Sequence, residues 1–174
     1  MLKLILTTAA LACVAPAAFA HITLEAGQGA QKAAYKAILR VPHGCNGEAT
    51  KAVRIQIPEG VIAVKPMPKA GWTIEVKTGA YAKPYDYYGT SLTEGVTELA
   101  WTGGDLPDAW YDEFVFRAFL TDSLPVGSTV YFPVVQECAT ATERWIEIPA
   151  EGQGEDDLEL PAPGLKIGEP VAGD

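Results

Sequence analysis

The sequence predicts an all-β fold, an antiparallel two-sheet sandwich of the immunoglobulin or cupredoxin type. Three observations support this prediction. Apolar and polar residues alternate in short runs, Pro and Gly recur between the runs where an antiparallel sheet would turn, and no stretch sustains the spacing of an amphipathic helix. Sandwiches of this type are assembled from short strands separated by such turn signals.

The strands can be placed one by one from this alternation. Residues 34–41 begin in strict alternation and are followed by Pro-His-Gly, which predicts a strand and a turn. In residues 52–57 three branched apolar side chains face one way, whereas Arg54 and Gln56 face the other, so this strand has one apolar face. Further strands are predicted at 61–65, 72–76, 97–102, 113–120, 129–136 and 144–148.

Two segments differ in character from these strands. Residues 81–88 hold four tyrosines and are interpreted as a loop, whose rings either pack over one end of the sandwich or form a binding surface. From residue 151 the chain becomes acidic and rich in Gly and Pro, which predicts a partly flexible tail over 151–174. Leu160, Leu165 and Ile167 are apolar anchors that would allow this tail to dock. The domain itself is predicted to span 21–150.

The first 20 residues are predicted to be a signal peptide. Lys3 supplies the positive start, residues 4–16 supply the apolar core, and Ala18-Phe19-Ala20 matches a cleavage signature. The apolar run is shorter than the roughly 20 residues that cross a bilayer. We therefore expect export to the periplasm or another compartment outside the cytoplasm, cleavage after Ala20, and no membrane span in the mature form.

The chain has three cysteines, and Cys13 lies in the predicted leader. The remaining two, Cys45 and Cys138, suggest one disulfide in an exported domain. A metal site formed by the two thiolates is the alternative, which an oxidising compartment disfavours. Acylation of Cys13 in a lipoprotein is also conceivable, but Ala10 stands where a branched aliphatic residue would be expected.

The overall charge and the absence of catalytic motifs exclude several functions. A formal net charge of −9 repels nucleic acid and anionic lipid, so we expect neither as a partner; the same charge favours cationic ligands or simply keeps the chain soluble. The sequence contains no Gly-x-Ser-x-Gly elbow, no phosphate-binding glycine loop and no histidine pair at helical spacing. We expect that the protein is not an enzyme.

Cleavage after Ala20 would make His21 the first residue. An N-terminal histidine chelates a metal through its α-amine and imidazole Nδ1, whose ordinary pKa values of about 8 and about 6.5 allow metal to displace protons near neutral pH. Nitrogen and oxygen donors in a square-planar arrangement favour Cu(II). His21 is therefore the candidate copper ligand, unless histidine merely happens to follow the cleavage site.

His43 is the only other histidine, in a turn beside Cys45. As a second imidazole at the copper it would shift the protein towards oxidative copper enzymes. A histidine in such a turn is more often a turn residue or a hydrogen-bond partner.

Four motifs, in matching order over residues 21–149, resemble the YcnI-like family of exported copper-binding domains. They are His-Ile-Thr-Leu at 21–24, Pro-Met-Pro-Lys-Ala-Gly-Trp at 66–72, Asp-Glu-Phe-Val-Phe at 112–116 and Glu-Arg-Trp at 143–145. This resemblance implies a cupredoxin-like sandwich that binds Cu(II) through a single-histidine brace with a tryptophan nearby.

By position, the resemblance assigns the brace to His21 and the neighbouring tryptophan to Trp145. Glu113 is the candidate for an oxygen ligand or for a group that holds the brace in place; its alternative is a strand-edge carboxylate in water. The family pattern places no copper histidine at position 43.

These observations lead to one main functional hypothesis and two alternatives. We expect an exported Cu(II)-binding protein for copper storage, delivery or resistance, with a copper donor or acceptor protein of the envelope as its partner. The alternatives are a copper-dependent oxidase or oxygenase with a two-histidine site, and a metal-free envelope interaction module.

Overall fold

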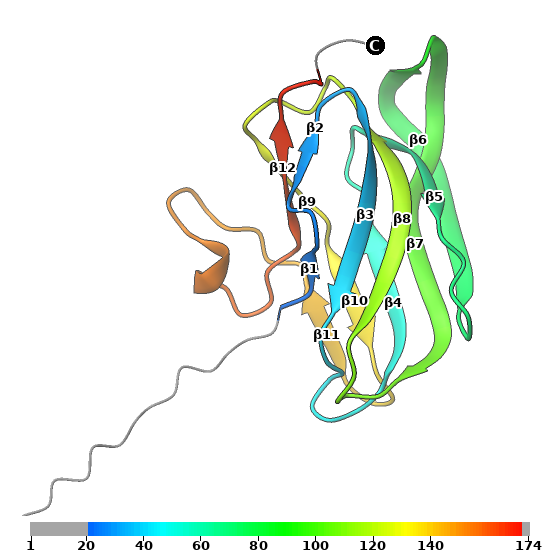
Figure 1. Cartoon of the computed structure of the whole chain (residues 1–174), viewed down its shortest axis with the longest axis vertical. Coiled ribbons are helices and arrows are strands. Elements are labelled where there is room, and N and C mark those ends of the chain that lie inside the picture. The colour runs from blue at the N-terminus through cyan, green and yellow to red at the C-terminus, as the bar shows by residue number, and fades with distance from the viewer. Residues whose placement is uncertain (1–20, 172–174) are drawn as a thin grey trace, which may run out of the picture.

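Two packed layers of mainly antiparallel strands form the molecule in the computed structural model, which describes residues 21–171 (Figure 1). The predicted leader at 1–20 and the last three residues lie outside the described residues. Within 21–171 the helical content is one 3-10 turn, Glu155–Asp157, and no helix there is long and apolar enough to cross a membrane. The prediction of an all-β antiparallel sandwich is confirmed.

The first sheet has four strands in the order β1-β3-β8-β5, all antiparallel. Alternation explains its two faces, because on β3 the side chains of Tyr35, Ala37, Leu39 and Val41 are buried and those between them are more exposed. The strands span Thr23–Leu24 (β1), Ala33–Val41 (β3), Asp112–Leu120 (β8) and Val61–Pro66 (β5).

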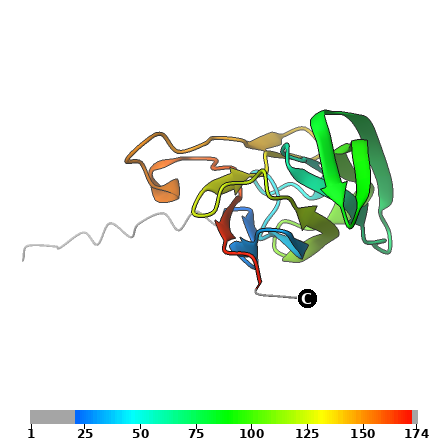
Figure 2. The ribbon, with the colours of Figure 1, turned by 90° about the horizontal axis from the view of Figure 1, so that it is seen from above.

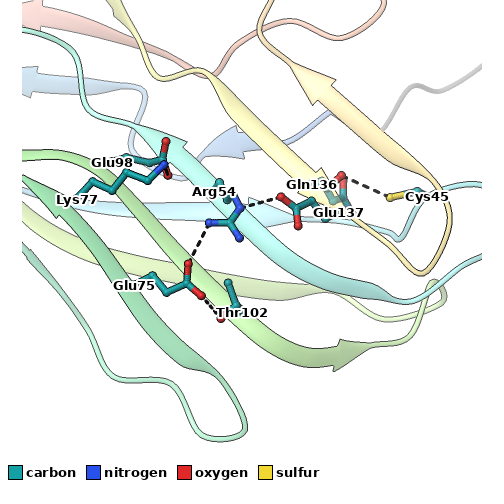
Figure 3. A network of polar contacts seen from close by, with 8 residues as sticks. All are labelled: Cys45, Arg54, Glu75, Lys77, Glu98, Thr102, Gln136 and Glu137. Atoms are coloured by element: carbon teal, nitrogen blue, oxygen red, sulfur yellow. Dashed lines mark hydrogen bonds and ion pairs between the residues drawn. The ribbon is translucent and has the colours of Figure 1, made fainter.

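The second sheet has five strands in the order β11-β10-β4-β7-β6. On β4, Val53 and Ile55 are fully buried, whereas Arg54 points outward and binds Glu75 on β6 and Glu137 on β10 (Figure 3). The strands span Thr142–Trp145 (β11), Val134–Glu137 (β10), Thr50–Gln56 (β4), Thr90–Leu106 (β7) and Thr73–Tyr87 (β6).

The core lies between the two sheets and is rich in aromatic rings. Trp101, on β7, is fully buried and lies 5.5 Å, between ring centroids, from Phe114 on β8. Phe114 also meets Trp72 edge to face at 4.8 Å. Aromatic pairs at such distances add to the stabilisation that comes from the buried apolar area itself.

A small third sheet joins both ends of the chain, with β2 (Gln28–Ala30) parallel to β12 (Gly164–Gly168) and β9 (Thr129–Tyr131) antiparallel to it. Leu165 and Ile167 on β12 are fully buried, so the packed unit extends beyond residue 150. These side chains are two of the three predicted apolar anchors, and the third, Leu160, is partly buried against the core. The predicted strand at 129–136 is split into β9 and β10, because Pro133 between them has no N–H to donate to a ladder.

The interpretation of residues 81–88 as a loop is wrong. The chain stays extended to Tyr87 and turns through Tyr88 and Gly89, whose φ angles of 50° and 80° are both positive, as in a two-residue hairpin turn. The tyrosine rings pack against Ile62 and Phe119, which pair across β5 and β8 and form a cluster separate from the main core, on the outer face of the first sheet. Seen from above, this hairpin (green) stands on one side of the molecule, opposite the orange segment that follows β11 (Figure 2).

The predicted disulfide is present between Cys45 and Cys138, with the two Cα atoms 6.0 Å apart. It joins the turn before β4 to the residue after β10. The sequence separation is 93, and chain-entropy models give about 4 to 5 kcal/mol for a loop of roughly that length. A persistent disulfide fits an oxidising compartment.

Candidate metal centre

Trp145 is the centre of the candidate site. It lies at the end of β11, is only 3% exposed, and has two imidazole rings against its indole. The ring centroid of His21 is 5.9 Å from that of Trp145, and the ring centroid of His43 is 6.1 Å from it. Both distances lie within the range of direct aromatic contact. The structure therefore brings together three sequence-predicted residues from three distant parts of the chain.

His21 is held by the residues that follow it. Ile22 is 1% exposed and belongs to the core, and Thr23 pairs with Arg40 across β1 and β3. The imidazole itself is half-buried and lines a hollow of about 200 Å³ together with Arg40 and Glu155. The histidine is thus fixed at the end of the sandwich beside a small space.

His43 is held by its own turn. Its Nδ1 lies 2.6 Å from the carbonyl oxygen of Gly44, and the Gly44 N–H donates to the Oδ1 of Asp108 at 3.0 Å. A Cβ at Gly44 would overlap the backbone of Glu48 at 1.8 Å, so the close turn requires glycine at this position.

A buried amide connects His43 to Trp145. The side chain of Gln136 is fully buried; its Nε2 donates to the carbonyl oxygen of His43 and to the hydroxyl of Thr50, both at 2.7 Å. Its Oε1 accepts from the Trp145 Nε1–H at 3.1 Å. The Cys45 Sγ lies 3.9 Å from the Gln136 carbonyl oxygen (Figure 3). Because all of these groups are satisfied, the network fixes the indole beneath the two imidazoles.

Glu143 is the carboxylate that the sequence reasoning missed. It lies two residues before Trp145 on β11, and its Oε2 is buried with no hydrogen-bond partner among residues 21–171. Burial is the main cause of its raised pKa; nearby His43 opposes the rise and Asp108 adds to it. The signal that could have found it is the spacing of two, which places Glu143 and Trp145 on one face of a strand.

Glu113 lies in a different environment. It stands opposite Arg40 on β3 and accepts a hydrogen bond from the hydroxyl of Tyr111. Burial and this bond to Glu113 raise the pKa of Tyr111 to about 12. The Arg40 guanidinium donates to the Thr23 hydroxyl at 3.0 Å. The described contacts of Glu113 are therefore to the outer face of the first sheet, and its role as a copper ligand stays a prediction.

The donor atoms of the candidate site can be compared with those that Cu(II) prefers. Residues 21–171 contain no cluster of three or more His, Cys, Asp or Glu side chains able to hold a metal. A single-histidine brace does not need one, because its second nitrogen is the α-amine that cleavage would free. The half-buried His21 imidazole and the Glu143 carboxylate, whose charged neighbours are His43 and Asp108, are nitrogen and oxygen donors of the kinds that Cu(II) takes, so the chemistry of the donors fits copper.

Taken with the disulfide, the two-layer fold defines an immunoglobulin-like β-sandwich domain. It is similar to the crystal structure of an uncharacterized protein from Nocardia farcinica with an immunoglobulin-like fold, with a TM-score of 0.63, 25% identity, and coverage of 85% of this chain and 98% of that one. No curated protein matches the chain.

The chain belongs to the family described as domain of unknown function DUF1775, whose model matches residues 21–167. This is the family of the YcnI-like proteins, so the resemblance found in the four sequence motifs is confirmed at the level of the family. The match also runs past residue 150, in agreement with the burial of β12 in the packed unit.

Proposed function

We propose that this protein is an exported Cu(II)-binding protein for copper storage, delivery or resistance, which acts after removal of a signal peptide ahead of His21. One observation carries the proposal. The His21 ring packs 5.9 Å from the buried Trp145, on whose strand Glu143 has a buried carboxylate oxygen without a hydrogen-bond partner among residues 21–171.

The residues around Trp145 have complementary roles in this proposal. His21 would hold Cu(II) through its freed amine and Nδ1, and Glu143 would contribute an oxygen that is costly to leave unpaired. The indole of Trp145 shields one side of the site, and Gln136 keeps that indole in place. The net charge of −9 favours the approach of a cation, whether free or carried by a copper donor or acceptor protein of the envelope.

The test of the brace uses two variants of the exported protein, His21→Ala and a form that keeps one extra residue ahead of His21. Both should lose tight Cu(II) binding, since the first lacks the imidazole and the second lacks the free amine beside it. Native mass spectrometry with a copper titration reports the first residue, the disulfide and the stoichiometry together. Native stoichiometry in the extended form would show that the brace is wrong.

A matched pair of variants tests whether Glu143 or Glu113 supplies the oxygen ligand. Glu143→Gln should weaken Cu(II) binding by about tenfold or more, the range found for groups that bind or orient metal ligands. Glu113→Gln changes the same chemical group on the outer face of the other sheet and should leave the affinity unchanged. If only Glu113→Gln weakens binding, the oxygen ligand is Glu113, as the resemblance implied.

A copper-dependent oxidase or oxygenase is the second candidate, and one observation favours it. The His43 ring is as close to Trp145 as the His21 ring, at 6.1 Å against 5.9 Å. Electron paramagnetic resonance of the Cu(II) form distinguishes the two functions. One coordinated imidazole, unchanged in His43→Ala, supports the binding protein; two imidazoles, one lost in His43→Ala, would favour the enzyme. Failure of the processed protein to bind copper would favour the metal-free module.

A further inference from the structure

Three cations form a row on the outer face of the first sheet. Lys36 on β3 and Lys65 on β5 both lie directly opposite Arg117 on β8, the strand between them, and all three residues are exposed. Like charges directly opposite each other destabilise a sheet. The register that creates the row depends on a β-bulge between Ile62 and Lys65, which shifts the pairing of β5 with β8.

Within residues 21–171, no carboxylate neutralises this row. None of the three cations makes an ion pair there, and the polar contact of Arg117 is to the Tyr87 hydroxyl at 3.5 Å. Carboxylates are not scarce in the chain, which has 22 Asp and Glu against 13 Lys and Arg. An acidic protein has thus kept three unpaired, mutually repelling cations side by side, which points to an anion from outside the chain.

An apolar hollow lies beside the cations. Its volume is about 480 Å³, within the range of about 300 to 1,000 Å³ that is usual for small-molecule sites. The same three cations line it, and Met67, 51% exposed, stands at its side. The apolar part of the lining includes Tyr35, Pro66, Met67, Pro68, Val115 and Phe116. The hollow therefore combines an apolar lining with positive charge along one row.

We propose that this hollow binds a small anionic amphiphile, a molecule with a carboxylate or similar head and an apolar tail. The head lies on the row of Lys36, Arg117 and Lys65, where it removes the repulsion among them, and the tail covers Met67 and Val115. The three positive charges favour an anionic head, and the apolar lining favours an apolar tail. This site belongs to the outer face of the first sheet and does not depend on copper.

Other occupants of the hollow fit less well. A second copy of the chain would bring an identical cation row and a further net charge of −9, so the two surfaces would repel. The same net charge opposes adsorption of the whole protein to an anionic membrane. Neither form of repulsion applies to a free amphiphile, because a small molecule in the hollow interacts mainly with the three nearby positive charges.

Met67 provides the reporter for the test. The chain has two methionines, Met1 and Met67, so methyl-labelled methionine in the full chain gives a signal at the hollow, which Met67→Leu identifies. Sodium dodecanoate is titrated below its micelle concentration while the Met67 methyl resonance is followed. A saturable shift is expected. Lys36→Gln/Lys65→Gln should weaken binding by about tenfold, equivalent to about 1.4 kcal/mol.

The matched control is Lys32→Gln/Lys166→Gln, which removes the same charge from two exposed positions elsewhere and should bind like the parent chain. Four results would overturn the proposal: no saturable shift, an equal response to dodecyltrimethylammonium, equal binding by both double variants, or a shift with protein concentration alone, which indicates a second copy. A response confined to phosphatidylglycerol vesicles would also overturn it and would identify a membrane surface.

Discussion

Two arginines, one on each outer face of the sandwich, have neighbours of opposite charge. On the five-stranded sheet, Arg54 lies between two carboxylates, 3.1 Å from Glu75 and 2.7 Å from Glu137, and the arrangement neutralises itself (Figure 3). On the four-stranded sheet, a strand-central arginine, Arg117, lies between two lysines. Both arrangements lie on outer sheet surfaces of one domain, so the fold alone dictates neither pattern.

This difference in neighbours distinguishes charges that stabilise the fold from charges that are suited to binding a ligand. Cross-strand pairs of opposite charge contribute roughly 0.2 to 1 kcal/mol each, and pairs of like charge cost similar amounts. The ion pairs of Arg54 therefore add to the free energy of unfolding, whereas the row of Lys36, Arg117 and Lys65 lowers it. A charge pattern that costs stability is a better indication of a ligand than one that supplies it.

The largest expected effect is that of Arg54→Glu. This change removes two ion pairs and places a third carboxylate between Glu75 and Glu137, so the free energy of unfolding should fall by about 1 to 2 kcal/mol. Urea denaturation at low salt measures it. Arg54→Gln, which removes the pairs without adding repulsion, should cost about half as much. Equal losses in the two variants would show that repulsion has no part.

Arg117→Glu tests the other face, and its expected sign is opposite. A glutamate between Lys36 and Lys65 replaces two repulsions by two attractions, so the free energy of unfolding should rise slightly at low salt. The gain should shrink as sodium chloride is added, because salt screens exposed charges. A loss of stability at low salt would show that the contact of Arg117 with Tyr87 outweighs the repulsion.

The sequence predicted which side chains face the core better than it predicted which residues lie opposite each other on neighbouring strands. Alternation correctly assigns Val53 and Ile55 to the core and Arg54 to the surface, because a period of two is a local property. It does not reveal that Arg117 meets Lys36 and Lys65, since register depends on a bulge and on strands far apart in the sequence. The tyrosine hairpin was missed because its turn, Tyr88-Gly89, lacks the usual Asn or Asp.

In the candidate metal site, too, the sequence indicates individual residues but not the contacts between them. The chemistry of an N-terminal histidine makes His21 a candidate ligand and a family motif makes Trp145 its neighbour, both from the sequence; the contact between the two rings is seen in the structure. His43 lies beside that tryptophan, where the buried Gln136 bonds to both residues, and Glu143 lies on the same edge strand, near His43. The spacing of two places Glu143 and Trp145 on one face of a strand, but the sequence does not show that His43 lies near both residues. The role of Glu113 as a copper ligand stays a prediction.

Lowering the pH should weaken the ion pair between Arg54 and Glu75 on the five-stranded sheet. The hydrogen bond from Arg54, followed by that from Thr102, lowers the pKa of Glu75 below its ordinary value of 4.5. A depressed pKa in the folded state means that this stabilisation is complete above about pH 4.5 and is lost as pH falls through the folded-state pKa. Glu75→Gln should flatten the acid limb of stability against pH. Glu94→Gln, at an exposed position of β7, serves as control, and the same flattening there would contradict the assignment.

The smallest effect is expected from Lys77→Gln. Lys77 lies opposite Glu98 on the same sheet, and its Nζ is 2.7 Å from the carboxylate, but the lysine side chain is 68% exposed. Water and salt screen such a pair, so its removal should cost no more than about 0.5 kcal/mol in the free energy of unfolding. The loss should disappear in 1 M sodium chloride, where the screening length is about 3 Å. Glu98 is only 17% exposed, and a larger loss that survives salt would therefore mean that the pair is shielded from solvent and that the variant leaves the Glu98 carboxylate without its counter-charge.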